Sequence, residues 1–221
     1  MARDKQRRNT FDPRRVLTGR GAGQARKRFA PRQVVYLQGD PADAAYYVES
    51  GRVKISTVTP TGKEAVIAIR GPGQFFGTRC LVGGRMGTAT ALIACSLVRV
   101  STSALIRLLR EEPDFAVMFA TYLARQSIDD QESIVDHLIN PAEKRLARTL
   151  LQLADSAGDD RNDRRSISVT INQAVLANMV GTTRSRINFF MNRFKRQGYI
   201  EYDRNGSLSV RRSLLGFLRD T

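Results

Sequence analysis

The sequence has few of the residues that build metal and disulfide sites. It contains two cysteines, Cys80 and Cys95, one histidine, His137, and no tryptophan. Two cysteines exclude a disulfide framework and a four-cysteine zinc or iron–sulfur site, and one histidine excludes a histidine-rich metal site. No apolar run approaches the roughly 18 residues that span a membrane, and no apolar stretch follows the basic N-terminus as in a secretory signal. We therefore expect a soluble cytoplasmic protein with no membrane partner.

Acidic residues are also scarce. Against 21 Asp and Glu the chain carries 36 Lys and Arg, which gives a formal net charge of +15 over 221 residues. The 42% share of hydrophobic residues is ordinary for a globular protein, so we expect a folded core. A large positive charge on a folded protein favours binding to a polyanion such as nucleic acid.

The positive charge is concentrated at the two ends of the chain. Residues 1–32 have a net charge of +9, residues 33–139 a net charge of −1 and residues 140–221 a net charge of +7. Because the first segment has no apolar periodicity, we expect residues 1–30 to form a flexible basic extension, either a solvated tail or an arm that contacts DNA. The basic C-terminal third has the pattern of a folded domain.

Residues 31–110 have the pattern of a β domain. Short apolar runs are separated by turn residues, and glycine recurs about every eleven residues between Gly39 and Gly73. Short strands with turns at this spacing predict an antiparallel sandwich or barrel. Cys95 lies in the apolar run of a further strand, where we expect it to be buried and unreactive.

A long helix is predicted over residues 111–139, beginning near Pro113. Along it, residues recur at alternating spacings of four and three, as in the seam that a two-stranded coiled coil buries, with one glutamine to fix the register. The alternative is an ordinary amphipathic helix that packs on its own domain. We expect a homodimer through the seam residues Val117, Thr121, Ala124, Ile128, Gln131, Val135 and Leu138.

Residues 140–221 have the pattern of a winged helix-turn-helix. Gly181 separates two helices, and the second, from Arg184 to about Arg196, has an inward apolar stripe. A strand, an Asn205-Gly206 turn signal and a returning strand follow as a hairpin. A glycine-linked helix pair followed by a hairpin predicts a DNA-binding domain.

The polar face of that second helix is the expected contact with double-stranded DNA. Arg184 offers a bidentate fork to guanine, and Ser185 and Asn188 are short hydrogen-bonding groups suited to base edges. Basic residues near the helix end and in the hairpin suit phosphate contacts, which position a protein without reading sequence. The predicted DNA-binding residues are Thr182, Thr183, Arg184, Ser185, Arg186, Asn188, Phe189, Asn192, Lys195 and Arg204.

From about residue 31 to residue 215 the sequence resembles the CRP/FNR family of bacterial regulators, the family of the cyclic-AMP receptor protein. The matching motifs, in family order, are Gln38-Gly39-Asp40, the Tyr47–Lys54 run, Gly62-Lys63-Glu64, the Gly73–Gly77 run, the Lys144–Ala154 run, the Leu176–Arg186 run and Gly198-Tyr199-Ile200. The resemblance implies the α+β fold class, with an N-terminal antiparallel β-roll of the cyclic-nucleotide-binding type, a long dimerisation helix and a C-terminal winged helix-turn-helix. It also implies a homodimeric transcription regulator that binds a near-palindromic DNA site and contacts RNA polymerase.

The sequence departs from the family at the positions that bind cyclic AMP. Where cyclic-AMP binders have a glutamate for the ribose the chain has Thr78, and where they have Arg-Ser for the phosphate it has Thr88-Ala89. The family's Thr-Ser pair on the long helix aligns with Asp130-Gln131, which places a carboxylate near a phosphate. Without the arginine, nothing offsets the charge of a desolvated phosphate. We therefore expect that cyclic AMP is not the effector.

Two arginines near these positions leave the effector open. Arg79 and Arg85 either bind a different anion or are plain surface arginines. The candidate effector pocket comprises Gly77, Thr78, Arg79, Arg85, Thr88, Ala89, Asp130 and Gln131.

The recognition helix departs from the family as well. Arg184 keeps the family's arginine, but Ser185 stands where glutamate is frequent, and Phe189 replaces a second base-contacting arginine. We therefore expect a half-site that differs from the usual family sequence.

No cofactor and no enzymatic activity are expected. The N-terminus lacks the clustered cysteines with which some relatives hold an iron–sulfur cluster, and one histidine does not supply the ligands of the haem-sensing relatives. The glycines near residue 21 lack the strand and the Gly-Lys-Ser/Thr of a phosphate loop. Control by a thiol or by another small ligand, and sequence-independent nucleoid-type DNA binding, are the alternatives.

Overall fold

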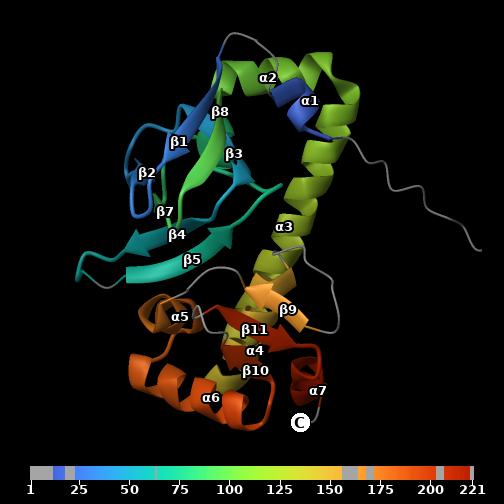
Figure 1. Cartoon of the computed structure of the whole chain (residues 1–221). Helices are drawn as coiled ribbons and strands as arrows, with labels where there is room; N and C mark the ends of the chain where they lie inside the picture. Colours follow the sequence, from blue (N-terminus) through green and yellow to red (C-terminus); the bar gives the residue numbers. More distant parts are fainter. Residues whose placement is uncertain are drawn as a thin grey trace, which may run out of the picture.

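The chain forms a β domain, a long helix and a C-terminal helical domain (Figure 1). This computed structural model describes residues 12–17, 23–62, 64–155, 164–167, 172–202 and 207–219. The predicted α+β class and the order of its three parts are confirmed.

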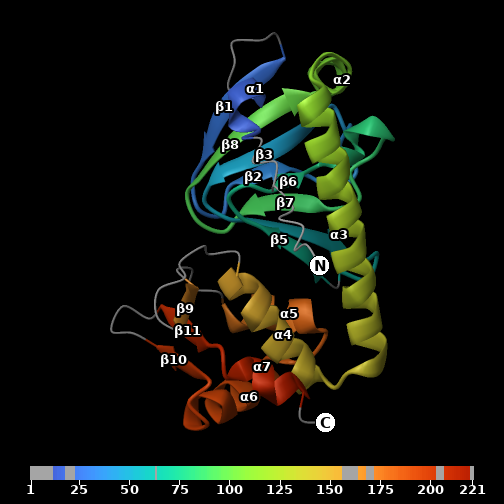
Figure 2. The same ribbon diagram turned by 90° about the vertical axis from the view of Figure 1, so that its right-hand side faces the viewer.

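Two antiparallel four-stranded sheets make up the β domain (Figure 2). The first sheet has the order β1 (Gln24–Phe29), β8 (Cys95–Ser101), β3 (Ala44–Ser50) and β6 (Phe75–Phe76). The second sheet has the order β2 (Val34–Tyr36), β7 (Thr88–Ala91), β4 (Val53–Val58) and β5 (Glu64–Arg70). A 3₁₀ helix, η1 (Thr78–Leu81), follows β6.

Strand β3 is buried on both faces, and its alternation divides the apolar residues between two cores. Ala44, Tyr46 and Val48 belong to the core that contains buried residues of both sheets. Ala45 and Tyr47 point the other way and belong to a core shared with the helices. Successive side chains of a strand face opposite sides, so one continuous apolar run fills both spaces. The first sheet is therefore the middle layer of the domain.

The second core is closed by helices α2 (Thr102–Glu111) and α3 (Pro113–Ile139). The Ser101 hydroxyl accepts a hydrogen bond from the Ala104 backbone N–H at 3.3 Å, which caps α2, and Pro113 stands in the first turn of α3. The predicted start and end of the long helix are confirmed. Its N-terminal half packs on the β domain, and its C-terminal half leads down to the second domain (Figure 2).

The expectation of a flexible extension over residues 1–30 is wrong for its described part. Residues 24–29 form β1, an edge strand paired with β8 from Gln24 opposite Val100 to Phe29 opposite Cys95. Before it, α1 (Arg14–Leu17) carries one buried anchor, because Leu17 is only 1% exposed in the core beneath α2 and α3. An edge strand is held by backbone pairing and does not require an apolar pattern. The basic sequence of β1 therefore gave no sign that these residues form a strand.

The C-terminal domain begins with α4 (Ala142–Asp155). Its other elements are β9 (Arg164–Ile167), α5 (Gln173–Val180), α6 (Arg184–Arg196), β10 (Ile200–Tyr202), β11 (Leu208–Arg211) and α7 (Leu214–Arg219). Strands β10, β11 and β9 form a small antiparallel sheet in that order. The predicted hairpin is thus present, while its Asn205-Gly206 turn lies outside the described residues.

Candidate DNA-binding surface and effector pocket

The turn between α5 and α6 is built by one glycine and one threonine. Gly181 adopts a left-handed conformation with φ of 69°, and its N–H donates to the Ala177 carbonyl, which ends α5. The Thr183 hydroxyl then accepts a hydrogen bond from the Arg186 N–H at 3.3 Å and caps α6. Thr183 is therefore the N-cap residue of α6.

Helix α6 is held by its inner stripe. Ile187, Phe190, Met191 and Phe194 are buried in the core of the C-terminal domain, together with apolar residues of α4, α5 and the small sheet. These four positions lie at i, i+3, i+4 and i+7, as the sequence predicted. Because one face of α6 is fixed in the core, the opposite face projects outward.

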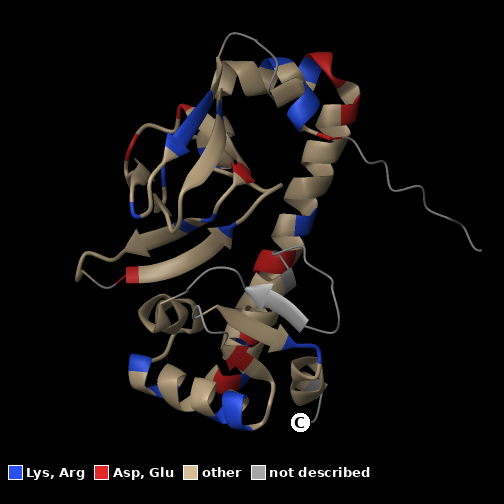
Figure 3. Cartoon of the chain, viewed as in Figure 1, with Lys and Arg blue, Asp and Glu red and all other residues tan. Residues whose placement is uncertain are grey.

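The predicted DNA-binding residues of α6 lie outside that stripe. Lys and Arg gather at both ends of the helix (Figure 3). Thr182 is half-buried and Arg204 lies outside the described residues. The exposed members of the set are Thr183, Arg184, Ser185, Arg186, Asn188, Phe189, Asn192 and Lys195.

A chain of side-chain amides crosses the exposed surface from α5 to α6. The side-chain oxygen of Asn188 accepts hydrogen bonds from the amide of Gln173 at 3.4 Å and from that of Asn192 at 3.3 Å. The ammonium of Lys195 lies 6.0 Å from the ring centre of Tyr202 and links α6 to β10, the first strand of the hairpin. Sequence reasoning missed Gln173, because nothing in its local pattern shows that its amide reaches the next helix.

The helix-turn-helix is attached to the end of α3 through backbone carbonyl groups. Arg145 of α4 donates from Nε to the Val180 carbonyl at 2.9 Å. The ring nitrogens Nδ1 and Nε2 of His137 lie 2.8 Å and 3.3 Å from the carbonyl oxygens of Ser133 and Met179. Both contacts reach the C-terminal end of α5, which is thereby joined to α4 through Arg145 and to the last turn of α3 through His137. His137 therefore has a structural role where the end of α3 meets α5.

The β domain also contacts the C-terminal domain directly. Arg52 is almost fully buried and donates from Nη2 to the Leu153 carbonyl at 3.3 Å, and burial lowers its pKa. Ile69 of β5 and Ile93 pack against the core of the C-terminal domain. Figure 1 shows α5 beneath β5. Sequence reasoning did not predict this contact, because its two residues are 101 positions apart in the chain.

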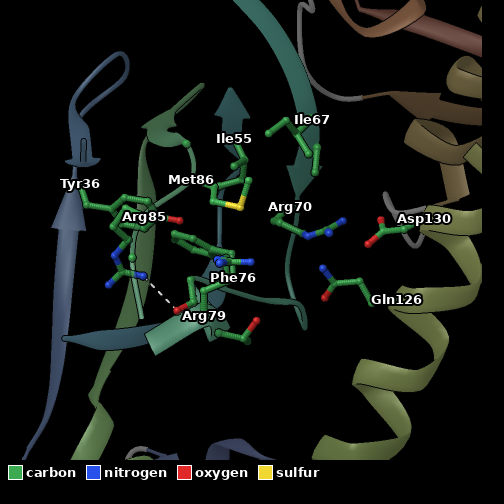
Figure 4. A pocket seen from close by; sticks show the side chains of 15 residues that line it. Tyr36, Ile55, Ile67, Arg70, Phe76, Arg79, Arg85, Met86, Gln126 and Asp130 are labelled. Atoms are coloured by element: carbon green, nitrogen blue, oxygen red, sulfur yellow. Dashed lines mark hydrogen bonds between the residues drawn. The ribbon is translucent and has the colours of Figure 1, made fainter. Parts of the chain in front are cut away.

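A pocket of about 420 Å³ lies between the second sheet, the loop after β6 and α3 (Figure 4). Five of the eight predicted pocket residues line it: Gly77, Thr78, Arg79, Arg85 and Asp130. The other three do not. Ala89 is buried in the core between the sheets, and the Thr88 hydroxyl accepts a hydrogen bond from the Gln38 N–H. Gln131 is one residue from Asp130 and therefore about 100° around the helix.

Arg85 is not a plain surface arginine, which corrects the simpler of the two sequence interpretations. Arg85 is only 5% exposed, and its guanidinium donates to the carbonyls of Gly77 at 2.9 Å and Ala44 at 2.6 Å. It also lies over the ring of Tyr36, 4.1 Å from the ring centre. The isolated arginine in a glycine-rich loop gave no local sign of burial, because its partners are backbone carbonyls 8 and 41 positions away in the chain.

The pocket combines apolar walls with charged groups at its edge. Tyr36, Ile55 and Phe76 contribute apolar surface, and burial raises the pKa of the Tyr36 phenol to about 12. Arg70 of β5 and Asp130 of α3 point toward one another across the pocket (Figure 4). Sequence reasoning missed the contributions of Tyr36, Arg70 and the α3 residue Gln126, since they come from separate elements.

The two thiols have no sign of reactivity. Cys80 and Cys95 are both buried, and burial raises the pKa of each. The described part of the chain contains no cluster of three potential metal-ligating side chains. No helix among the described residues has the length and apolar character needed to cross a membrane.

Two family models match the two halves of the chain. Residues 26–112 match the cyclic nucleotide-binding domain, and residues 144–213 match the Crp-like helix-turn-helix domain. This pair of domains, with the exposed polar face of α6, defines a DNA-binding transcription regulator. The chain belongs to the CRP/FNR family.

Similar proteins are transcription regulators rather than enzymes. The chain is 28% identical over 171 residues, 76% of each chain, to the "CRP-like cAMP-activated global transcriptional regulator" of Mycobacterium tuberculosis. It is 28% identical over 175 residues, 79% of this chain and 86% of the other, to the transcriptional regulator LdrP of Thermus thermophilus. The structure of FixK2 from Bradyrhizobium japonicum shares the fold, with a TM-score of 0.78 at 17% identity, over 89% of this chain and 96% of that chain.

Proposed function

We propose that the chain acts as a homodimer that reads a near-palindromic DNA site through α6, contacts RNA polymerase and responds to a small ligand other than cyclic AMP. The observation that supports DNA reading is the exposed polar face of α6. A buried stripe and a capped glycine turn fix the orientation of this face. A helix presented in this way fits the major groove with its N-terminal residues toward the base edges.

The exposed face of α3 supports the homodimer. All seven predicted seam residues are exposed in the single chain, and Ile128 and Leu138 are 55% and 80% exposed. Phe115 and Phe119, on the other face of the helix, are buried in the β domain. A helix that packs one face on its own domain while leaving a second apolar stripe exposed has the surface of an interface.

The pocket does not fit cyclic AMP by the usual contacts. The positions expected to bind the phosphate, Thr88 and Ala89, do not line it, and Thr78 has no carboxylate for a ribose. Arg70 and Arg79 add positive charge from other positions, beside the apolar walls. This combination favours an anionic ligand with an apolar body. Because both thiols are buried with raised pKa values, a small ligand is favoured over a thiol signal.

The ligand assignment is tested by titration calorimetry with cyclic AMP. We expect no saturable heat at millimolar nucleotide, because the contacts that would offset a buried phosphate are missing. The cAMP-activated relative from Mycobacterium tuberculosis, measured in the same buffer, is the positive control. Tight, saturable binding to the present chain would overturn the interpretation of Thr78 and Thr88.

The DNA-reading role is tested with Arg184→Ala on a site located by genome-wide footprinting. We expect paired half-sites about one helical turn apart for the wild type. The variant should lose about 1–3 kcal/mol of binding free energy on that site and accept other bases at one position per half-site, because a bidentate contact to guanine is removed. Binding titrations on the site and on single-base variants measure both effects.

The matched control is Lys195→Ala, at the other end of α6. As a proposed phosphate contact, Lys195 should contribute equally to the binding free energy of all DNA sequences. Its removal should weaken binding to every sequence and reduce the salt dependence of binding. If Arg184→Ala behaved in the same way, Arg184 would not read a base. Uniform coverage of the genome without paired half-sites would instead favour the nucleoid-type alternative.

A further inference from the structure

Phe189 is the exception on the outward face of α6. It lies four residues after Ser185 and three before Asn192, so these three side chains share one side of the helix. Its neighbours on that side are polar, whereas Phe189 exposes 59% of a large apolar surface. The inner stripe already supplies the core contacts of α6, so packing within the domain does not require a phenylalanine here.

The ring of Phe189 is held in place from below. It meets the ring of Phe190 edge to face, with 5.8 Å between the ring centres and an interplanar angle of 68°. Phe190 is itself buried in the core of the domain. An aromatic side chain has only two rotatable bonds, and a fixed neighbour restricts them further. Phe189 therefore presents a pre-organised apolar surface on the side proposed to enter the groove.

The partner of such a surface in DNA is chemically restricted. In the major groove, guanine, cytosine and adenine present hydrogen-bonding groups, and only thymine adds an apolar group, its C5-methyl. A phenyl ring offers no conventional hydrogen bond to the former and packs well against the latter. Asn188 lies about 100° around the helix from Phe189. Its side-chain oxygen accepts from Gln173 and Asn192, and its amide nitrogen is the group that can donate to a base edge on that adjacent side.

We propose that Phe189 is a specificity-determining residue that contacts the C5-methyl group of one thymine in each half-site. This inference rests on the proposed function, since it requires that α6 reads the major groove. Where an arginine at this position would select guanine, the phenylalanine selects a base for its methyl group. The expected half-site therefore has a thymine that is read by apolar contact alone.

The experiment removes the methyl group from the DNA rather than the side chain from the protein. Operator duplexes are taken from the footprinted site, and each thymine of the half-sites is replaced in turn by deoxyuridine, which pairs identically but lacks the C5-methyl. At one thymine per half-site, wild-type affinity should fall about fourfold, the effect of losing one buried methyl group. For Phe189→Ala the same replacement should have no effect at that position.

The control variant is Asn192→Ala, on the same face of the helix, which should keep the full penalty at that thymine. Phe189→Ala leaves the buried stripe intact, and circular dichroism verifies that it is folded. The inference fails if deoxyuridine weakens wild type and Phe189→Ala equally, or if no thymine is sensitive. If the wild type shows no preference for any operator over random DNA, the proposed function fails instead, which is a separate outcome.

Discussion

Phe75→Ala is expected to lower the free energy of unfolding by about 3–5 kcal/mol, the usual effect of truncating a fully buried phenylalanine. Phe75 is 1% exposed, and its ring centre lies 5.0 Å from that of Tyr47 and 5.3 Å from that of Phe119. It also contacts Phe115 and Tyr122 edge to face. Chemical denaturation followed by circular dichroism measures the loss.

The size of this effect follows from where the contacts lie. Phe115, Phe119 and Tyr122 all belong to α3, whereas the next residue of β6, Phe76, lines the pocket. The cavity left by alanine would therefore open where the pocket strand meets the long helix. We expect the variant to loosen α3 from the β domain as well as to destabilise the chain.

Tyr122→Phe is the matched control for this contact. The Tyr122 hydroxyl donates to the Phe75 carbonyl at 2.7 Å and accepts from the Phe75 N–H at 3.1 Å. Removing only the hydroxyl keeps the aromatic packing and should cost about 1 kcal/mol. A loss below about 1 kcal/mol for Phe75→Ala would show that the aromatic cluster is not the main connection between sheet and helix.

The parts of the fold that sequence predicted are those with a local signal. Pro113 marks the start of α3, and Gly181 with its left-handed backbone marks the turn of the DNA-binding domain. The inward stripe of α6 follows from helical periodicity alone. Each of these features depends on residues within a few positions of one another, so a single sequence contains the whole signal.

The pocket was predicted less completely because its members meet only in the folded chain. The buried guanidinium of Arg85 donates to backbone carbonyls 8 and 41 positions away, and Arg70 reaches the pocket from β5. The family resemblance placed both Asp130 and Gln131 at the pocket, but only Asp130 lines it. Neighbouring residues on a helix point about 100° apart, so Gln131 faces a different direction. Strand β1 was missed for a related reason. Its backbone pairs with β8, which is distant in the sequence, and its own residues do not show the alternating apolar pattern of a strand.

Ile128→Lys is expected to convert the proposed dimer to a monomer and to reduce operator affinity by at least about 100-fold. In a two-fold symmetric seam, each residue lies near its own copy, so the substitution buries two like charges against one another. The two half-sites would then be bound independently, without the 10²–10⁴ gain that a linked pair provides. Analytical ultracentrifugation measures the assembly, and binding titrations on the full operator and on one half-site measure the affinity.

A lysine at the next position of α3 is the control, because it tests whether the effect is specific to the seam or arises from any new charge on the helix. Asp129 is exposed and lies about 100° around α3 from Ile128, so Asp129→Lys should leave both assembly and affinity close to wild type. Ile128→Lys should still bind a single half-site as the wild type does, because α6 is distant from the change. A variant that stays dimeric and binds the full operator normally would place the interface elsewhere, and the exposed stripe on α3 would then need a different partner.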